Sequence, residues 1–140
     1  MHRPQGRRTF LAFLGFAFAG LMGAASPERA AGAPLSTRRK HPDPRPGIDA
    51  SRVLARDRVS PDVADLFDQI REIPQIADGI RCQCGCADVE GMYSLLSCYE
   101  EPGMAQHCEI CQRVGRLVHR QHREHHTLDE IRAAVDQRFG

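Results

Sequence analysis

The chain has 140 residues, among them 19 Lys and Arg, 18 Asp and Glu, six Cys and no Trp. Its formal net charge of +1 is unevenly placed, because residues 60–140 hold 8 basic and 14 acidic side chains, a net of −6. An acidic domain without aromatic platforms argues against a nucleic-acid partner, and we expect none.

The first 25 residues have the pattern of a targeting segment. A polar, basic stretch precedes a charge-free apolar run of 16 residues from Phe10 to Ala25. Arg7-Arg8 before this run resembles a twin-arginine export signal, and an ordinary secretory signal with two arginines is the alternative. Because a bilayer span needs roughly 20 apolar residues, we interpret the segment as a signal peptide or an uncleaved N-terminal anchor. We expect an exported protein, periplasmic or otherwise extracytoplasmic, tethered to the membrane only where this segment is retained.

Residues 26–59 have the composition of a linker. The stretch is rich in Pro, Ala, Gly and Arg, and it holds 8 basic and 4 acidic residues. Pro42, Pro44 and Pro46 alternate with polar residues, a pattern that favours extended, solvated chain. We therefore predict a disordered linker that ends where ordered structure begins, near residue 60.

The remainder, residues 60–140, shows helical but no strand-like periodicity and predicts one small, cysteine-rich, all-α domain. Ser60-Pro61 is typical of a helix start, and Pro74 ends or kinks that helix. Thr127 and Glu130 fit a capping box before the last helix. About 80 residues without Trp bury a thin core, and domains of this size commonly need a metal or disulfides. The predicted helices span residues 60–73, 90–98, 107–125 and 127–139.

All six cysteines fall within thirty residues. They form a C-x-C-x-C loop (Cys82, Cys84, Cys86), a single Cys98 and a C-x-x-C pair (Cys108, Cys111). The intervening Gly85 lets the loop curl around a centre, and the C-x-x-C pair lies one helical turn apart. Soft thiolates select Cu(I), Zn(II) or an iron–sulfur cluster, and the sulfurs beyond a four-ligand zinc site favour Cu(I) or a mixed role. We predict a Cu(I) or Zn(II) site with all six cysteines as ligands.

Two other uses of the cysteines stay open. Six cysteines in an exported domain allow fifteen disulfide pairings, which would make it a disulfide-stapled interaction module. The C-x-x-C pair would alternatively exchange disulfides, with Cys108 attacking and Cys111 resolving. Export after folding favours the metal, because a protein folded in a reducing compartment can load metal before it meets oxidants. No nucleophile–base–acid set and no Gly-rich phosphate loop is visible, so we interpret the chain as a binding protein rather than an enzyme.

The histidines form a second group of candidate ligands. His107 adjoins Cys108, and His122 shares the helix face of Cys111, so both join the cysteines as candidates. The other histidines of this region fit a solvated, partly cationic helix end that suits the helix dipole: His119, His125 and His126.

The cysteine-rich part resembles the PCYCGC-motif proteins, a family of small exported bacterial proteins. Four pieces match in order, namely Cys82–Cys86 for the name motif, Gly91–Cys98 for a G-x-x-S-L-x-x-C stretch, Cys108–Cys111, and Leu128–Arg132. Three positions depart from the family pattern: Arg81 and Gln83 replace its proline and tyrosine, and Met92 replaces its usual histidine. The resemblance implies an envelope protein whose cysteines are its functional residues, and it supplies no activity.

A looser similarity links the C-x-C-G-C segment, a later cysteine and a final short helix to the thiol proteins of cytochrome c maturation. Together these features predict an exported soft-metal-binding protein that acts in envelope metal handling or metalloprotein assembly. Its expected partners are the metal ion and an envelope metalloprotein client.

Overall fold

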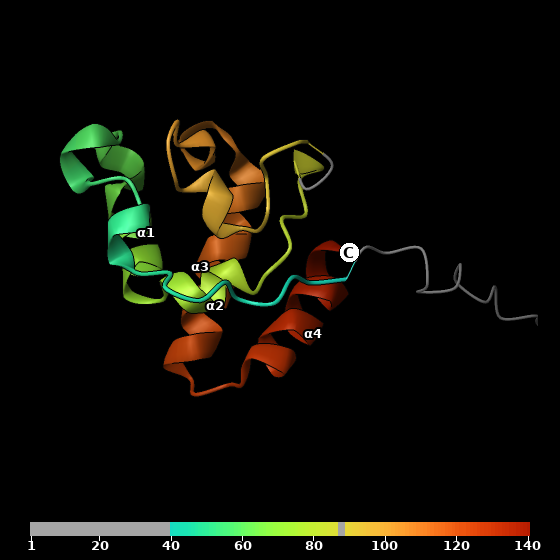
Figure 1. Cartoon of the computed structure of the whole chain (residues 1–140). Coiled ribbons are helices and arrows are strands. Elements are labelled where there is room, and N and C mark those ends of the chain that lie inside the picture. Colours follow the sequence, from blue (N-terminus) through green and yellow to red (C-terminus); the bar gives the residue numbers. More distant parts are fainter. Residues whose placement is uncertain (1–39, 87–88) are drawn as a thin grey trace, which may run out of the picture. The chain divides into compact units, whose positions relative to one another are not determined.

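The structure is a computed structural model that describes residues 40–86 and 89–140 (Figure 1). Its described residues form helices and turns without a strand, which confirms the predicted all-α class. None of the helices in these ranges is long and apolar enough to cross a membrane. The predicted targeting segment (1–25) and the first part of the predicted linker (26–39) lie outside the described residues. The α-helices are α1 (Pro61–Glu72), α2 (Pro74–Asp78), α3 (Glu109–Arg123) and α4 (Leu128–Phe139).

Helix α1 begins where the sequence predicts it. Pro61 occupies the first helical turn, and the helix ends at Glu72, before Pro74 opens α2. The side chain of Ser60 does not cap the helix; its backbone N–H instead donates to Gln106 Oε1 at 2.9 Å. The buried face of α1 follows the predicted helical spacing through Val63, Ala64, Leu66, Phe67 and Ile70.

Helix α3 packs against both α1 and α4, and it lies between them in Figure 1. Its apolar face buries Val114, Leu117 and Val118, as their spacing predicts. The predicted capping box of α4 is present, because the Thr127 hydroxyl accepts from the Glu130 N–H while the Glu130 carboxylate accepts from the Thr127 N–H at 2.7 Å.

Residues 40–59 differ from the solvated chain expected of a linker. Ile48, Val53 and Leu54 are buried in the core, and the Leu54 N–H donates to the Tyr99 carbonyl at 3.0 Å. Figure 1 shows this segment passing α4 and α2 on its way to α1. It carries two short 3₁₀ turns, η2 (Ala50–Arg52) and η3 (Arg56–Arg58). The apolar side chains between its prolines and charges explain the difference, because burying them offsets the cost of ordering the segment.

The predicted helix over residues 90–98 is largely absent. Only a 3₁₀ turn, η5 (Leu96–Cys98), forms there. The Ser97 hydroxyl accepts hydrogen bonds from the N–H groups of Tyr93 and Ser94 at 3.2 and 3.4 Å. These side-chain bonds compete with the backbone hydrogen bonds of a helix. A further 3₁₀ turn, η6 (Met104–His107), leads into α3.

Candidate metal centre

Three separate segments bring all six cysteines into one cluster. The C-x-C-x-C loop supplies three sulfurs, η5 supplies one and the start of α3 supplies two. Neighbouring Sγ atoms lie between 2.9 and 3.7 Å apart, as the following contacts show: Cys82–Cys84 3.1, Cys84–Cys86 2.9, Cys82–Cys98 3.4, Cys82–Cys111 3.7, Cys84–Cys111 3.5 and Cys108–Cys111 2.9 Å. We call these six residues the sulfur cluster.

All six cysteines are free thiols in the structure. A disulfide joins its sulfurs at about 2.05 Å, well below every contact in the sulfur cluster. The structure therefore brings the six cysteines together as unpaired thiols.

Local backbone geometry shapes the C-x-C-x-C loop. Gly85 has a φ of 87°, in the left-handed region that favours glycine, and this lets the chain turn between Cys84 and Cys86. Two hydrogen bonds hold the start of the loop in place. The Leu95 N–H donates to the Ile80 carbonyl at 2.7 Å, and the Arg81 N–H donates to the His41 side chain at Nδ1, at 2.9 Å.

A buried ion pair holds the chain just before this loop. Asp78, at the end of α2, accepts from the Arg45 N–H at 2.8 Å, from the Arg45 guanidinium at 2.7 Å and from the Ser94 hydroxyl at 2.7 Å. Burial opposes ionisation of Asp78, but the bonds from Arg45 and Ser94 outweigh it and lower its pKa. The pair ties three segments together next to the sulfur cluster.

The C-x-x-C pair sits at the N-terminus of α3. Cys108 is the N-cap residue, and its sulfur accepts from the Cys111 N–H at 3.4 Å. Cys111 lies in the first turn and is fully buried. The positive end of the helix dipole therefore faces both sulfurs.

Cys98 reaches the cluster because Tyr99 fixes its turn against α3. Tyr99 is fully buried, and its hydroxyl donates to the Cys111 carbonyl at 2.9 Å. Its ring also meets Phe67 of α1 edge-on, with centroids 4.9 Å apart. The sequence pattern marks Tyr99 only as an apolar residue at the end of the predicted helix over residues 90–98, although a large aromatic residue directly after a cysteine could have indicated a part in the site.

The thiols in the cluster are unequal. Hydrogen bonds from Cys111 and Cys98 lower the pKa of Cys82 to about 2, despite its burial. The pKa of Cys111 is raised, because its thiol donates to Cys82 and because it is buried. Burial also raises the pKa of Cys84. Negative charge therefore collects first on Cys82, at the centre of the cluster, where a cation would be attracted most strongly.

Three groups of sulfurs lie close enough to share one metal ion, with every pair inside a group within 4.8 Å. Each contains three cysteines: Cys82, Cys84 and Cys86; Cys82, Cys98 and Cys111; Cys84, Cys108 and Cys111. Within the described residues these groups consist of cysteines alone. The sulfur cluster could therefore hold a metal through thiolates.

Neither candidate histidine joins these groups. His107 is exposed at the end of η6. His122 lines a surface hollow of about 600 Å³ with Arg123, His125 and His126, at the opposite end of α3 from the C-x-x-C pair. His119, on the same helix, instead contacts Glu72 at 2.9 Å.

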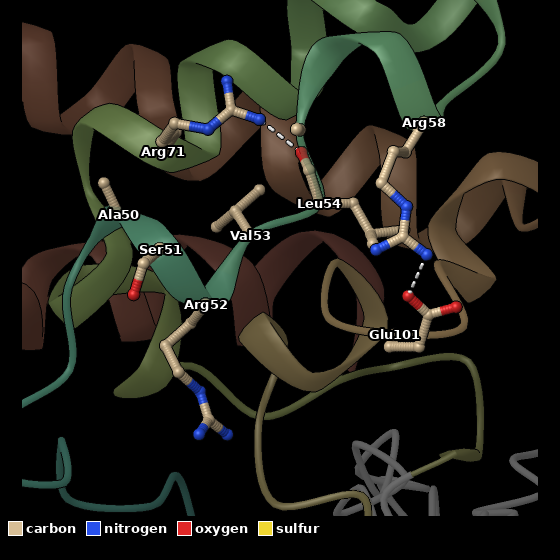
Figure 2. Close-up of a pocket in the computed structure, with 9 residues that line it drawn as sticks. Ala50, Ser51, Arg52, Val53, Leu54, Arg58, Arg71 and Glu101 are labelled. Atoms are coloured by element: carbon tan, nitrogen blue, oxygen red, sulfur yellow. Dashed lines mark hydrogen bonds and ion pairs between the residues drawn. The ribbon is translucent and has the colours of Figure 1, made fainter.

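A pocket of about 470 Å³ lies between η2, η3 and α1, and Figure 2 shows it. None of its lining residues is a cysteine or a histidine. Its three arginines are occupied. Arg52 donates to Glu100 at 2.8 Å, Arg58 pairs with Glu101 at 2.6 Å and Arg71 donates to the Leu54 carbonyl (Figure 2). The pocket thus offers no group comparable in reactivity to the sulfur cluster.

Comparisons of the chain with protein-family models, with curated proteins and with solved structures found no match. The described part of the chain is thus defined by its own features, a small all-α domain with six converging thiols. The resemblances drawn from the cysteine motifs stay predictions.

Proposed function

We propose that this protein binds a soft metal, Cu(I) or Zn(II), through the sulfur cluster. The observation that carries the proposal is the convergence of all six free thiols from three segments, with contacts of 2.9 to 3.7 Å. Thiolates are the preferred ligands of these two ions. Two sulfurs bound to one zinc ion at about 2.3 Å lie about 3.8 Å apart, close to the longer contacts here.

The cellular role belongs to the same proposal. The basic and apolar start of the chain and the resemblance to the PCYCGC-motif proteins support an exported protein of the cell envelope. There it would carry metal or supply it to an envelope metalloprotein, without chemistry of its own. Half-buried Cys84, Cys86 and Cys108 would give a client access to the metal from one side.

Metal content and a free-thiol count on full-length protein recovered from the cell envelope test the proposal. We expect copper or zinc in stoichiometric amount and six thiols that become reactive only when the metal is chelated. A control variant at an exposed residue, Asp57→Ala, keeps all six cysteines and should keep the metal. Three intact disulfides without metal would refute the proposal.

One observation favours a second function, thiol–disulfide exchange. Half-buried Cys108 caps α3 and its sulfur lies 2.9 Å from that of buried Cys111, an arrangement suited to an attacking and a resolving thiol. The Cys108 thiolate would attack a client disulfide and release one client thiolate; Cys111 would then displace the second, leaving the client reduced and the pair oxidised. A Cys111→Ser variant should trap the mixed disulfide, and its absence in metal-loaded cells would exclude this function.

A further inference from the structure

We propose that the sulfur cluster binds three Cu(I) ions as one centre, in which Cys82, Cys84 and Cys111 bridge two ions each and Cys86, Cys98 and Cys108 bind one ion each. This inference rests on the proposed metal binding and adds the metal, the number of ions and the role of every ligand.

The division of roles follows from the connectivity of the sulfurs. Cys82, Cys84 and Cys111 form a central triangle with sides of 3.1, 3.5 and 3.7 Å. Each also belongs to two of the three metal-competent groups, whereas every other cysteine belongs to one.

The remaining three sulfurs cap the sides of this triangle. Cys86 completes the side between Cys82 and Cys84, Cys98 the side between Cys82 and Cys111, and Cys108 the side between Cys84 and Cys111. The result is three three-sulfur sites that meet at shared corners. One ion in each of these groups uses all six cysteines as ligands.

Three-sulfur sites select Cu(I) over Zn(II). Structural zinc is almost always four-coordinate and tetrahedral. Cu(I), a soft ion with a filled d shell, is satisfied by three thiolates. Two zinc ions on six sulfurs would need only two bridging cysteines, which does not match the three shared sulfurs seen here.

The surroundings suit a compact anionic centre. Six thiolates and three Cu(I) ions carry a net charge of −3, and each thiol proton passes to the buffer on binding. The N-terminus of α3 points at the cluster, and the Cys111 N–H donates to the Cys108 sulfur at 3.4 Å. Such donors stabilise negative charge that three singly charged cations leave unbalanced.

Burial differs among the three sites. Cys82, Cys98 and Cys111 are all buried, whereas each of the other two groups contains two half-buried cysteines. A chelator that enters from solvent therefore reaches two sites more easily than the third. We expect one ion of the three to leave more slowly than the other two.

The test is an anaerobic titration of the reduced full-length chain with Cu(I) against a competing Cu(I) chelator, followed by native mass spectrometry. We expect a plateau of three ions per chain, with the metal-free and three-copper forms dominating at intermediate loading. X-ray absorption should show a copper–copper distance besides the copper–sulfur shell. A parallel titration with Zn(II) should reach no three-ion form.

Variants in adjacent loop positions separate bridging from terminal cysteines. Cys86→Ser removes a ligand from one site and should lower the plateau from three ions to two. Cys84→Ser removes a ligand from two sites and should lower the plateau to one ion. Cys84 and Cys86 are both half-buried and lie in the same loop, so burial and location do not account for the expected difference. The pair Cys108→Ser and Cys111→Ser should show the same order, and far-UV circular dichroism verifies that each variant is folded.

The possible outcomes distinguish this inference from the proposed function. One or two ions at the plateau, or a single copper–sulfur shell without copper–copper scattering, would overturn the three-ion centre and leave soft-metal binding intact. A plateau of four ions, with the same number of ions lost in each of the six Cys→Ser variants, would overturn the division into bridging and terminal ligands. Absence of copper and zinc binding by the reduced protein would overturn both.

Discussion

Replacing Gly115 with alanine should destabilise the domain, although alanine is the better helix former. Gly115 lies in the middle of α3 and is buried. A Cβ atom added there would collide with the hydroxyl of Tyr99. That hydroxyl donates to the Cys111 carbonyl at 2.9 Å, so the collision falls on the contact that positions Cys98 against α3.

The opposing contributions can be compared in size. Alanine in place of glycine gains about 1 kcal/mol of helix propensity. Forcing an extra methyl group into a packed core costs about 1–3 kcal/mol. Losing the buried hydrogen bond of Tyr99 costs a further 1–3 kcal/mol, roughly. The balance is a loss of about 3 kcal/mol in the free energy of unfolding, a large part of the roughly 5–15 kcal/mol typical of a domain.

Urea unfolding of the reduced, metal-free chain, followed by circular dichroism, measures this loss. The control is the same substitution in a Tyr99→Phe background, where the colliding oxygen is absent. The ring carbon Cζ then lies 3.1 Å from the new Cβ and has to give only slightly. Gly115→Ala should cost less than about 1 kcal/mol there, giving a coupling energy of about 2–3 kcal/mol. A Gly115→Ala variant more stable than the parent would refute the reasoning.

Three further predictions concern the segments that hold the cluster. Asp78→Asn should lower the free energy of unfolding by about 2–3 kcal/mol. Breaking a fully buried ion pair costs roughly 3–5 kcal/mol, and the loss here is smaller because the Arg45 side chain remains 32% exposed. Since the folded pKa of Asp78 lies below the unfolded value of about 3.9, this difference should hold above pH of about 5 and vanish as the pH falls through the lowered pKa. Leu54→Ala should cost about 2–4 kcal/mol, because Leu54 is buried, whereas a solvated linker would show no change. Removing Cu(I) with a chelator should lower the free energy of unfolding by about 4 kcal/mol for each site whose ion was present at a thousand times its Kd.

Each of these has a matched control. For Leu54→Ala it is exposed Asp57→Ala, expected to lie within about 0.5 kcal/mol of the parent. For Asp78→Asn it is Asp43→Asn, whose carboxylate is fully exposed. A loss of equal size in either control would show that the buried contacts are not the cause. The loss of free energy of unfolding on removal of Cu(I) should be smaller in the Cys98→Ser variant, which lacks one ligand of the most buried site.

The helical class and the helix ends could be predicted because they depend on local signals. Pro61 after serine, and Thr127 with Glu130, place helix starts through contacts within one turn of the chain. The convergence of the cysteines depends on tertiary packing instead. The spacing of the residues could suggest that the C-x-C-x-C and C-x-x-C arms share one centre. It could not predict which sulfurs belong to two groups, because that depends on how the loop packs against α3.

The parts that could not be predicted from the sequence depend on contacts that a hydrophobic periodicity does not show. Residues 40–59 read as a linker from their prolines and charges, yet Arg45 meets Asp78 and Leu54 meets Tyr99 across long stretches of chain. Helical spacing over residues 90–98 was outweighed by Ser97, which accepts local N–H groups. In both cases tertiary partners or a side-chain acceptor decide the conformation, and neither is visible in a periodicity.

The position of the cysteines links metal loading to the fold. Cys82, Cys98 and Cys111 belong to the same buried cluster as Phe67 and Tyr99, so as thiols they pack as small hydrophobic side chains. As thiolates they need hydrogen-bond donors or cations beside them to stay buried. In the proposed centre three cysteines belong to two sites each, so the first ion to bind would order ligands of the next and lower the conformational cost of binding later ions. The shared sulfurs therefore favour loading of the whole centre over partly filled forms, which is the behaviour that distinguishes one three-ion centre from three independent sites.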